Sequence, residues 1–430
     1  NCRKKKNIHG ISQINDRTII FLYMNIDSNT NLRPCTSCQM CAAVCPKNAI
    51  TISLDDYGFY RPIVNYYKCI DCGICTKYCY KFDKDIASFD IHEIKQSKLY
   101  AANVKDMDIL SHTTSGGVAD VLSHYLYYAG YKCIGVIYDS ESDIAKSIVA
   151  NDEYDLKSFR GSKYIQSYTL NALKDLINGC KNEKYAIFGT PCHIYAIHKY
   201  LERYNIRDNH ILIDLYCHGC PSMNLWKKYL SGLRSNNCLN EETSYSVNFR
   251  SKSHGWGRFA IEFSNNNKSK FVSRKTNDEF FNLFFSDMLL NKACHDCKLR
   301  DTLRYTDFRL GDFWGKEYIF NHNGVSAVSI VTKNAEKVFK QIENKLVFEE
   351  KSYESFLNWQ SIGKDIHPDP RTRHILLNML KTNDTTIKEC QMEYMKSLSA
   401  VGVVKKIAKN VLQHLPNSII SFIKYIYYKV

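Results

Sequence analysis

Eight of the eighteen cysteines occur in two groups that repeat one spacing. In each group the pattern is C-x2-C-x2-C-x3-C, and the second group follows the first at a distance of thirty-four residues. Quartets with this spacing are typical of 4Fe–4S clusters, whereas zinc is usually held by isolated C-x-x-C pairs, so a pair of zinc sites is the weaker alternative. The groups consist of Cys35, Cys38, Cys41 and Cys45, and of Cys69, Cys72, Cys75 and Cys79.

This repeat resembles the bacterial two-cluster ferredoxin domain. In such domains three cysteines come from one loop and the fourth comes from the other repeat. The resemblance implies one cluster on Cys35, Cys38, Cys41 and Cys79, and a second on Cys69, Cys72, Cys75 and Cys45. Tyr80 stands where the first repeat has Pro46, a small departure because proline shapes the turn and is not a ligand. Two clusters conduct single electrons, so a downstream domain must use them.

Four more cysteines are scattered through the following domain. Cys294 and Cys297 form a lone C-x-x-C, and a metal site there needs two further ligands. Cys192 follows one β-rich run and Cys217 ends the next, which places both at the carboxyl edge of a predicted sheet. Cys294 and Cys297 would then close the site from a later loop.

Alternating helix and strand patterns must position these residues. "KCIGVIY", "YAIFG" and "HILIDLYC" read as buried strands with helices between them, and residues 243–273 read as antiparallel strands. We predict a ferredoxin-like dicluster domain, a mixed α/β domain and a helical C-terminal region, in the α+β or α/β class. The expected boundaries are 1–31 for an N-terminal extension, 32–88 for the dicluster domain, 100–335 for the α/β domain and 336–430 for the helical region.

Seven motifs of the α/β domain carry a second resemblance. In chain order they are "TTSGGVADVLSHYL", "FRGSKYIQS", "FGTPCHIYAI", "DLYCHGCPS", "FRSKSHGWGRF", "CHDCKLR" and "RLGDFWG". With the ferredoxin module, over about residues 33–335, the chain resembles the coenzyme F-420 hydrogenase/dehydrogenase beta-subunit family. The resemblance implies FAD, an additional 4Fe–4S cluster, and electron transfer between a hydride carrier or substrate and one-electron clusters.

The family's cysteine motifs fall on the four scattered cysteines. The resemblance therefore implies a third 4Fe–4S cluster on Cys192, Cys217, Cys294 and Cys297, with zinc as the main alternative. Cys220 departs from the family pattern, in which this position is commonly apolar; it would be an alternative ligand or a free thiol.

Residues of the same motifs are the candidates for holding FAD. The glycines after Ser115 open a helix, where the backbone can approach a pyrophosphate, although a plain turn is the alternative. Lys163 would hold phosphate charge or be a solvated surface lysine, and Asp312 would bind the cofactor or cap a turn. The expected FAD-binding residues are Ser115, Gly116, Gly117, Arg160, Gly161, Lys163, Tyr164, Gln166, Gly189, Thr190, Pro191 and Asp312.

Flavin chemistry on a carbonyl or alkene needs a proton donor near the substrate. His218, beside Cys217, and His254 are the candidates, and each has a structural alternative. Trp256 would stack on the flavin ring or fill the core.

Net charge and the C-terminal sequence bear on partners. The net charge is +14, but no groove-reading motif or aromatic–basic platform indicates nucleic-acid binding. Residues 402–428 form an amphipathic, lysine-rich stretch that suits an anionic membrane surface, or packs on its own domain or an oligomer partner. Without a signal peptide or a long apolar run, we expect a cytoplasmic protein, with a peripheral place at the inner membrane face as the variant that the C-terminal stretch would allow. We expect residues 1–23 to be an upstream extension or flexible tail.

Two functional hypotheses follow. The first is an FAD- and 4Fe–4S-dependent oxidoreductase that reduces or oxidises a small organic substrate, such as a precursor in surface polysaccharide biosynthesis. The second is an electron-transfer subunit of a larger redox complex, oxidising a deazaflavin or ferredoxin, without a substrate of its own. In both, an external carrier such as ferredoxin, reduced flavin or deazaflavin exchanges electrons with the clusters.

Overall fold

The structure is a computed structural model that describes residues 24–86, 89–239, 244–265, 268–360, 362–363 and 365–427. The extension expected at residues 1–23 lies outside this range. Among the described residues, every helix is too short or too polar to cross a membrane.

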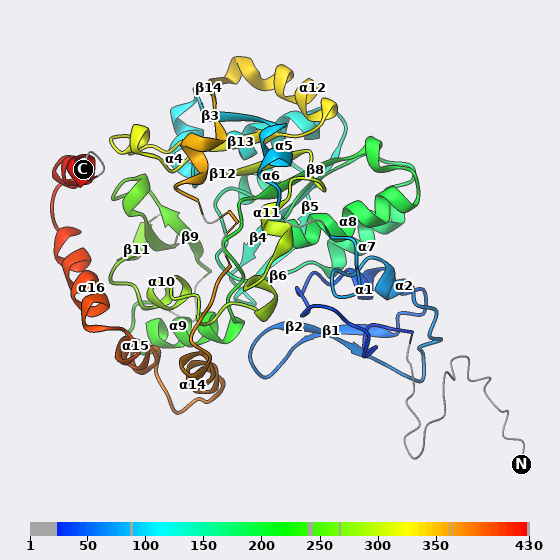
Figure 1. Ribbon diagram of the computed structural model, residues 1–430, viewed down its shortest axis with the longest axis horizontal. Helices are drawn as coiled ribbons and strands as arrows, with labels where there is room; N and C mark the ends of the chain where they lie inside the picture. The colour runs from blue at the N-terminus through cyan, green and yellow to red at the C-terminus, as the bar shows by residue number, and fades with distance from the viewer. Residues whose placement is uncertain are drawn as a thin grey trace, which may run out of the picture.

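A nine-stranded mixed sheet forms the centre of the molecule (Figure 1). Its order is β14-β3-β13-β12-β8-β7-β4-β5-β6, and the four neighbours β12, β8, β7 and β4 run parallel. The short strands β7 and β8 are largely apolar and buried, as expected for central parallel strands covered on both faces. In β8 the exceptions are the exposed Leu215 and the buried Asp214, which pairs with Arg309. The strands are β3 (Lys98–Val104), β4 (Lys132–Asp139), β5 (Ile144–Val149), β6 (Ser167–Tyr168), β7 (Tyr185–Phe188), β8 (Ile211–Leu215), β12 (Phe308–Asp312), β13 (Ser326–Ile330) and β14 (Leu346–Lys351).

Helices cover both faces of this sheet. Because side chains alternate along a strand, Ile211 and Ile213 of β8 join one apolar core while Leu212 joins another. The first core contains α5 (Val118–Tyr128), α6 (Glu153–Ser158) and α12 (Lys333–Ile342). The second contains α7 (Leu170–Gly179) and α8 (Pro191–Arg203). The mixed α/β prediction for this domain is confirmed.

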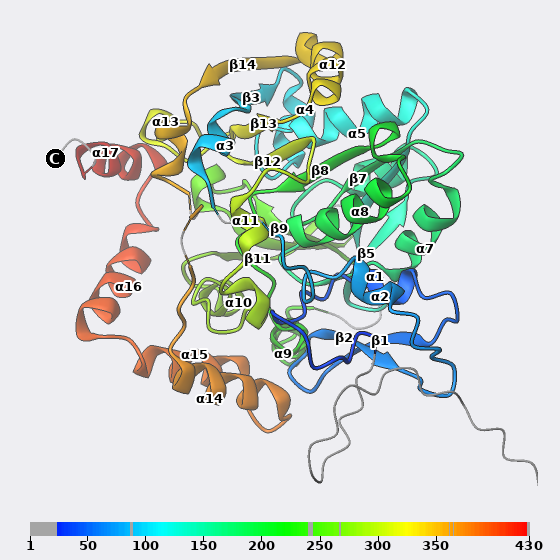
Figure 2. The same ribbon diagram turned by 45° about the vertical axis from the view of Figure 1, so that its right-hand side comes forward.

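The ferredoxin module packs against α7 and α8, at the lower right of Figures 1 and 2. It contains α1 (Met40–Ala43), α2 (Ile74–Lys77) and a hairpin of β1 (Ile50–Leu54) and β2 (Tyr60–Val64). Ile26 is buried in its core beside Cys41 and Cys75, so residues assigned to the N-terminal extension pack within the module.

A second, three-stranded antiparallel sheet follows the order β11-β10-β9, as expected for residues 243–273. It consists of β9 (Ser246–Ser251), β10 (Ala260–Asn265) and β11 (Lys268–Arg274). Together with α9 (Met223–Ser235) and α10 (Glu279–Phe284), it packs an aromatic core around Trp226.

The chain after residue 335 is not wholly helical. Strand β14 pairs antiparallel with β3 and completes the main sheet, so this region is structurally continuous with the α/β domain. The later helices then run along one side of the molecule (Figures 1 and 2). They are α13 (Tyr353–Leu357), α14 (Pro370–Lys381), α15 (Ile387–Lys396), α16 (Ala400–Leu412) and α17 (Asn417–Tyr427).

Candidate redox site

The first cysteine set surrounds a narrow cavity inside the ferredoxin module. Three of its members come from the first loop, and Cys79 comes from the second repeat. Burial raises the pKa of the Cys41 thiol, and repulsion from Cys38, Cys35 and Cys79 raises it further. Because these crowded thiols resist ionisation, a bound metal must supply the positive charge that holds them as thiolates. The donor set therefore fits an iron–sulfur cluster.

The second set lines a separate cavity in the same module. Cys69, Cys72 and Cys75 come from the second loop, and Cys45 crosses over from the first. Burial, together with repulsion from Cys45, Cys72 and Cys69, raises the pKa of Cys75 to about 11. The structure thus brings together both quartets in the crossed arrangement that the sequence implies.

The two cysteine loops share one backbone shape. Ser37 and Asp71 occupy equivalent places, with φ values of 67° and 49°, and Gln39 and Gly73 have φ values of 66° and 70°. These left-handed residues turn the chain tightly between successive cysteines, which lets three thiols face one cavity. Gln39 adopts this conformation without the freedom of glycine, so its side chain must contribute compensating contacts.

Gln39 supplies these contacts by joining the ferredoxin module to the α/β domain. Its buried side chain accepts hydrogen bonds from the backbone N–H groups of Thr169 and Leu170 and donates one to the Ser167 carbonyl, at 2.8, 2.9 and 3.0 Å. The inner cysteine loop is therefore anchored at the start of α7.

The third cysteine set gathers between the ferredoxin module and the main sheet. Cys192 is the second residue of α8, Cys217 follows β8, and Cys297 precedes α11 (Lys298–Asp301). Burial raises the pKa of Cys192, and so do Cys38, Cys217 and Cys297. Cys294 has its pKa raised to about 12 by burial and then by Cys297 and Cys217. The four scattered cysteines meet, and Cys192 also lies near the inner ferredoxin set through Cys38.

Cys220 joins this group as a fifth thiol. Burial raises its pKa, with further increases from Cys294 and Cys217. Its position therefore fits an alternative ligand better than an isolated thiol. Among the described residues, no three Cys, His, Asp or Glu side chains are arranged to hold a single metal ion.

Tyr80, which replaces the second proline, links the ferredoxin module to the C-x-x-C loop. Its side chain is 2% exposed, its hydroxyl accepts a hydrogen bond from Lys298 N at 3.2 Å, and it donates to the Asp296 carbonyl at 3.4 Å. The substitution that looked neutral in the sequence therefore fixes the loop carrying Cys297 against the inner cysteine set.

A cavity of about 250 Å³ lies at the carboxyl end of β7 and contains most of the residues expected to hold FAD. Two long helices begin at its wall, α5 after Gly117 and α8 after Thr190, and neither has a side-chain cap. Uncapped helix N-termini favour anions, since their first N–H groups are free and the helix dipole is positive there. The expected FAD residues that line it are Ser115, Gly117, Arg160, Gly161, Lys163, Gly189 and Thr190.

Two basic side chains of this cavity are held by other groups. Arg160 pairs with the buried Asp120, with Nε 2.6 Å from the carboxylate. The Lys163 ammonium donates to the carbonyls of Ser158, Phe159 and Arg160 at the end of α6, and burial lowers its pKa to about 7. Lys163 is therefore not a solvated surface lysine, which was the alternative for this residue.

The other expected FAD residues lie outside this cavity lining. Gly116 packs against β3 and β13, where a Cβ atom would lie 2.1 Å from the Ala102 carbonyl oxygen. Gln166 instead bonds Tyr60 N and the Gly58 and Pro221 carbonyls, which anchors the β1–β2 hairpin. Pro191 is the first residue of α8. The two remaining residues, Tyr164 and Asp312, line a second cavity.

This second cavity, of about 230 Å³, adjoins the third cysteine set through Cys217. His218 also lines it and is held by Asp287, with Nε2 2.7 Å from the carboxylate. Asp312 pairs with Arg250 and accepts a hydrogen bond from Trp256 Nε1 at 2.8 Å. The carboxylate of Asp312 is thus held by protein groups, and His218 remains a proton-donor candidate beside the cysteines.

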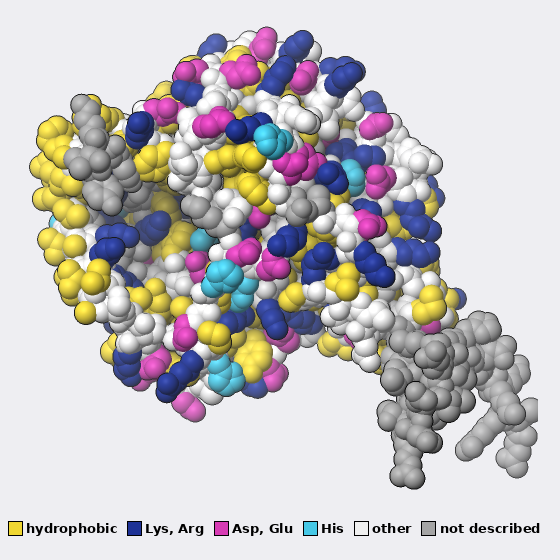
Figure 3. Space-filling view, viewed as in Figure 1, with side chains coloured by type: hydrophobic (Ala, Val, Ile, Leu, Met, Phe, Trp, Pro, Cys, Tyr) yellow, Lys and Arg dark blue, Asp and Glu magenta, His cyan; other side chains and the backbone are white. Residues whose placement is uncertain are grey.

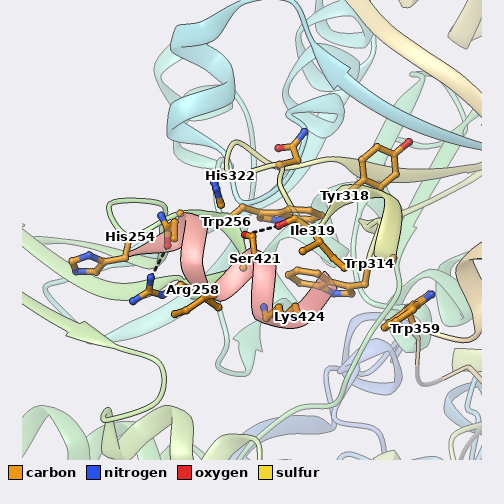
Figure 4. Close-up of a pocket in the computed structure, with 16 residues that line it drawn as sticks. His254, Trp256, Arg258, Trp314, Tyr318, Ile319, His322, Trp359, Ser421 and Lys424 are labelled. Atoms are coloured by element: carbon orange, nitrogen blue, oxygen red, sulfur yellow. Dashed lines mark hydrogen bonds between the residues drawn. The ribbon is translucent and has the colours of Figure 1, made fainter. Parts of the chain in front are cut away.

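His254 lies elsewhere, in a third cavity of about 250 Å³ under α17 (Figure 4). Its pKa is lowered by burial and by Arg274 and Arg258, which weakens it as an acid–base partner of His218. Trp256 stacks on Trp314 at 4.5 Å and is 2% exposed, so it fills the core rather than presenting a free face. The two histidine candidates do not meet.

Three basic residues near the second cavity were missed in the sequence: Arg250, Lys275 and Arg300. Two of them occur in the quoted motifs, but nothing in a linear pattern distinguishes a buried arginine from an exposed one. Their burial is a property of the packing alone.

Comparison with known proteins assigns two regions of the chain. Residues 182–355 match the family described as the C-terminal part of the beta subunit of coenzyme F420 hydrogenase/dehydrogenase, and residues 34–83 match the 4Fe-4S dicluster domain. A curated relative is a subunit of the F(420)H(2) dehydrogenase of Methanosarcina mazei, 25% identical over 187 residues. The match covers 42% of this chain and spans about half, 51%, of that relative.

A solved structure, the F420-reducing [NiFe] hydrogenase complex from Methanosarcina barkeri, has a similar chain with 17% identity and a TM-score of 0.42. The likeness covers 73% of this chain and 93% of that one. Residues 34–83 therefore match a 4Fe-4S dicluster domain, and residues 182–355 are similar to the C-terminal part of the coenzyme F420 hydrogenase/dehydrogenase beta subunit, in agreement with the resemblance seen in the sequence motifs.

Proposed function

We propose that this chain is the electron-transfer iron–sulfur subunit of a dehydrogenase-like redox complex. The observation that carries the proposal is the order of the cysteine sets: Cys72 of one ferredoxin set is exposed, the other set lies inward, and the third set adjoins the large cavities. When bound, 4Fe–4S clusters carry single electrons, and FAD exchanges them with electron pairs.

The ferredoxin module forms the first part of the proposed electron-transfer route. Its outer set is Cys69, Cys72, Cys75 and Cys45, and its inner set is Cys35, Cys38, Cys41 and Cys79. Near the outer set, Tyr67 is 98% exposed and Ile70 is 58% exposed, so an external one-electron carrier can dock there. The inner set is walled by Met40, Tyr60 and Tyr78 and leads to Cys192. The packing of the chain therefore separates the electron entry point at the outer set from the interior, and it excludes water between the inner set and Cys192.

FAD is part of this proposal and is supported by the cavity at α5 and α8. The two free helix N-termini would hold its phosphate charge, and the walls formed by Phe159 and Phe188 would exclude water from the ring. Arg160 would contribute little net charge, because Asp120 neutralises it. The 4Fe–4S assignment of the third cysteine set belongs to the same proposal.

The relatives favour the subunit hypothesis over an enzyme with its own biosynthetic substrate. The Methanosarcina mazei relative is by name part of an F420H2 dehydrogenase, and a reduced carrier of that kind is the two-electron partner that we infer for this chain. The idea of a polysaccharide precursor gains no support from the comparisons.

The test is a measurement of iron, acid-labile sulfide, zinc and flavin on anaerobically purified protein. About twelve irons and one FAD per chain are expected, because three clusters hold about four irons each. About eight irons with one zinc would refute the third cluster, and a flavin-free protein with full iron would refute the FAD assignment.

The C-terminal helices support a separate proposal, contact with an anionic membrane surface. Exposed apolar side chains lie along α16, including Val401, Val404, Ile407 and Val411, all more than half exposed, and Figure 3 shows the apolar surface on that side. No acidic residue occurs after residue 396, so no carboxylate of this segment would repel anionic lipid headgroups. Co-sedimentation with anionic but not neutral vesicles, lost in V404E/I407E, is expected; equal sedimentation of the wild type and V404E/I407E would refute it.

A further inference from the structure

The cavity beside Cys217 has an excess of buried positive charge. Arg250, Lys275 and Arg300 all line it, and Asp312 is the carboxylate that shares the lining. Figure 3 shows further basic side chains along the hollow between the C-terminal helices and the body. A buried charge without a partner is unfavourable, so this arrangement calls for a compensating anion.

Arg250 has a free donor inside this site. Its side chain is 3% exposed, one terminal nitrogen pairs with Asp312, and the other donates to the Trp256 carbonyl at 3.5 Å. Its Nε, however, is buried and has no hydrogen-bond partner among the described residues. A buried N–H without an acceptor is unfavourable, and a bound acceptor would recover that energy.

Lys275 is a second cationic side chain of this cavity, and it has no negatively charged partner among the described residues. Its ammonium lies 4.0 Å from the centre of the Phe285 ring and 4.8 Å from that of Phe259, while the Arg250 guanidinium lies 4.3 Å from the same Phe259 ring. Two cations therefore share one aromatic ring. None of the ion pairs found among the described residues includes Lys275.

The charged groups around Lys275 are mostly cations, so they do not supply the negative charge that it lacks. Burial, together with Arg250, Lys409 and Lys424, lowers its pKa to about 7, against an opposing effect of Asp312. Asp312 is bound by Arg250 and Trp256, and among the described residues it forms no ion pair with Lys275.

Arg300 connects the cavity to the cysteines. One of its terminal nitrogens donates to the Cys294 carbonyl, and the other is buried without a hydrogen-bond partner among the described residues. Its positive charge also lowers the pKa of Cys217 and Cys297, although burial keeps both above their usual value. A ligand held in this cavity would therefore lie between the basic residues and the third cysteine set.

We infer that the cavity lined by Arg250, Lys275 and Cys217 binds a small anionic molecule through a carboxylate or phosphate group. The Nε of Arg250 and the ammonium of Lys275 are its two donors, and Tyr164 and Trp314 form aromatic walls beside it. Anion binding itself does not depend on the proposed function. That the anion is the molecule exchanging electrons does rest on that function.

The first test uses sulfate as the probe, because it keeps its double charge throughout the neutral range. Holoprotein is acetylated at constant ionic strength with and without sulfate, and the modification of each lysine is measured by peptide mass spectrometry. We expect sulfate to protect Lys275 severalfold and to leave the exposed Lys227 unchanged. Equal modification of Lys275 with and without sulfate would overturn the inference.

The second test separates this site from the general positive charge of the protein. Calorimetric titration with sulfate should show about tenfold weaker binding in Lys275→Gln, and wild-type affinity in Lys227→Gln. In the wild type, sulfate binding should weaken above about pH 7, because Lys275 loses its proton. Lys275→Arg should still bind sulfate above that pH, because arginine stays charged. Unchanged affinity in Lys275→Gln would contradict the assignment. If the wild-type protein bound sulfate as expected but did not turn over a reduced carrier, that result would count against the proposed function and not against the anion site.

Discussion

The two ferredoxin cysteine sets have nearly the same sequence spacing and loop backbone but different surroundings. The first set faces the α/β domain, through Gln39 at the start of α7 and Tyr80 against the C-x-x-C loop. The second set faces solvent, where Cys72 and Tyr67 are exposed. The internal repeat thus produces two similar ligand loops. Packing against the α/β domain makes the two cluster sites unequal, because one then faces the domain and the other faces solvent.

Removing one inner ligand should have the largest effect. Cys38→Ser should lose about four irons and nearly all electron transfer between an external donor and the flavin, because Cys38 belongs to the inner set and lies near Cys192 of the third set. Iron analysis and stopped-flow reduction provide the measurement. Cys238→Ser, which alters a cysteine outside all three sets, serves as the control, and full transfer in Cys38→Ser would disprove the route.

Replacing a ligand of the third set should have a narrower effect. Cys294→Ser should lower the iron content by about four per chain while the ferredoxin clusters remain reducible by dithionite. Electron paramagnetic resonance of the reduced protein would distinguish the clusters. Cys220→Ser is the matched comparison: it should retain the iron if the four scattered cysteines are sufficient, and lose it if Cys220 is a ligand.

The exposed residues around the outer cysteine set should influence docking of the electron donor rather than the redox chemistry of the clusters. Tyr67→Ala should raise the KM for a protein electron donor about tenfold with little change in kcat, since exposed aromatic residues commonly anchor interfaces. Steady-state kinetics with a ferredoxin donor measure this effect. Tyr128→Ala, which removes another exposed tyrosine on α5, should have no effect, and equal effects of the two changes would place the donor elsewhere.

The smallest effects are expected on stability, and they should differ between the repeats. Gln39→Ala should lower the free energy of unfolding by about 3 kcal/mol, because it leaves two buried backbone N–H groups and a carbonyl unpaired. Gly73→Ala, at the equivalent place, should cost about 1 kcal/mol from left-handed strain alone. Thermal unfolding with intact clusters measures both values, and equal losses would mean that the inner loop is not anchored as described.

Local patterns were enough to predict the two cysteine quartets and the central strands, while the crossed pairing came from the resemblance to two-cluster ferredoxins. Ligand spacing within one loop is set by bond lengths and turn geometry, and buried parallel strands are nearly continuously apolar, with Asp214 as the exception in β8. Strand β14 was missed because it lies at the sheet edge, with a mostly exposed and charged sequence. Gln166 was assigned to the flavin by residue type, yet its partners are backbone groups of the β1–β2 hairpin and Pro221.

The sequence by itself determined which cysteines can act together, the start of a helix at Gly117, and the resemblance of residues 182–355 to the F420 hydrogenase/dehydrogenase beta subunit. Only the tertiary structure decided which ferredoxin set faces inward, that Cys220 joins the third set, and that Arg250 and Lys275 share one ring without sharing a counterion. Spacing along the chain fixes contacts a few residues apart. Burial and charge balance depend instead on segments brought together from distant parts of the chain, and no local pattern records which of those segments will meet.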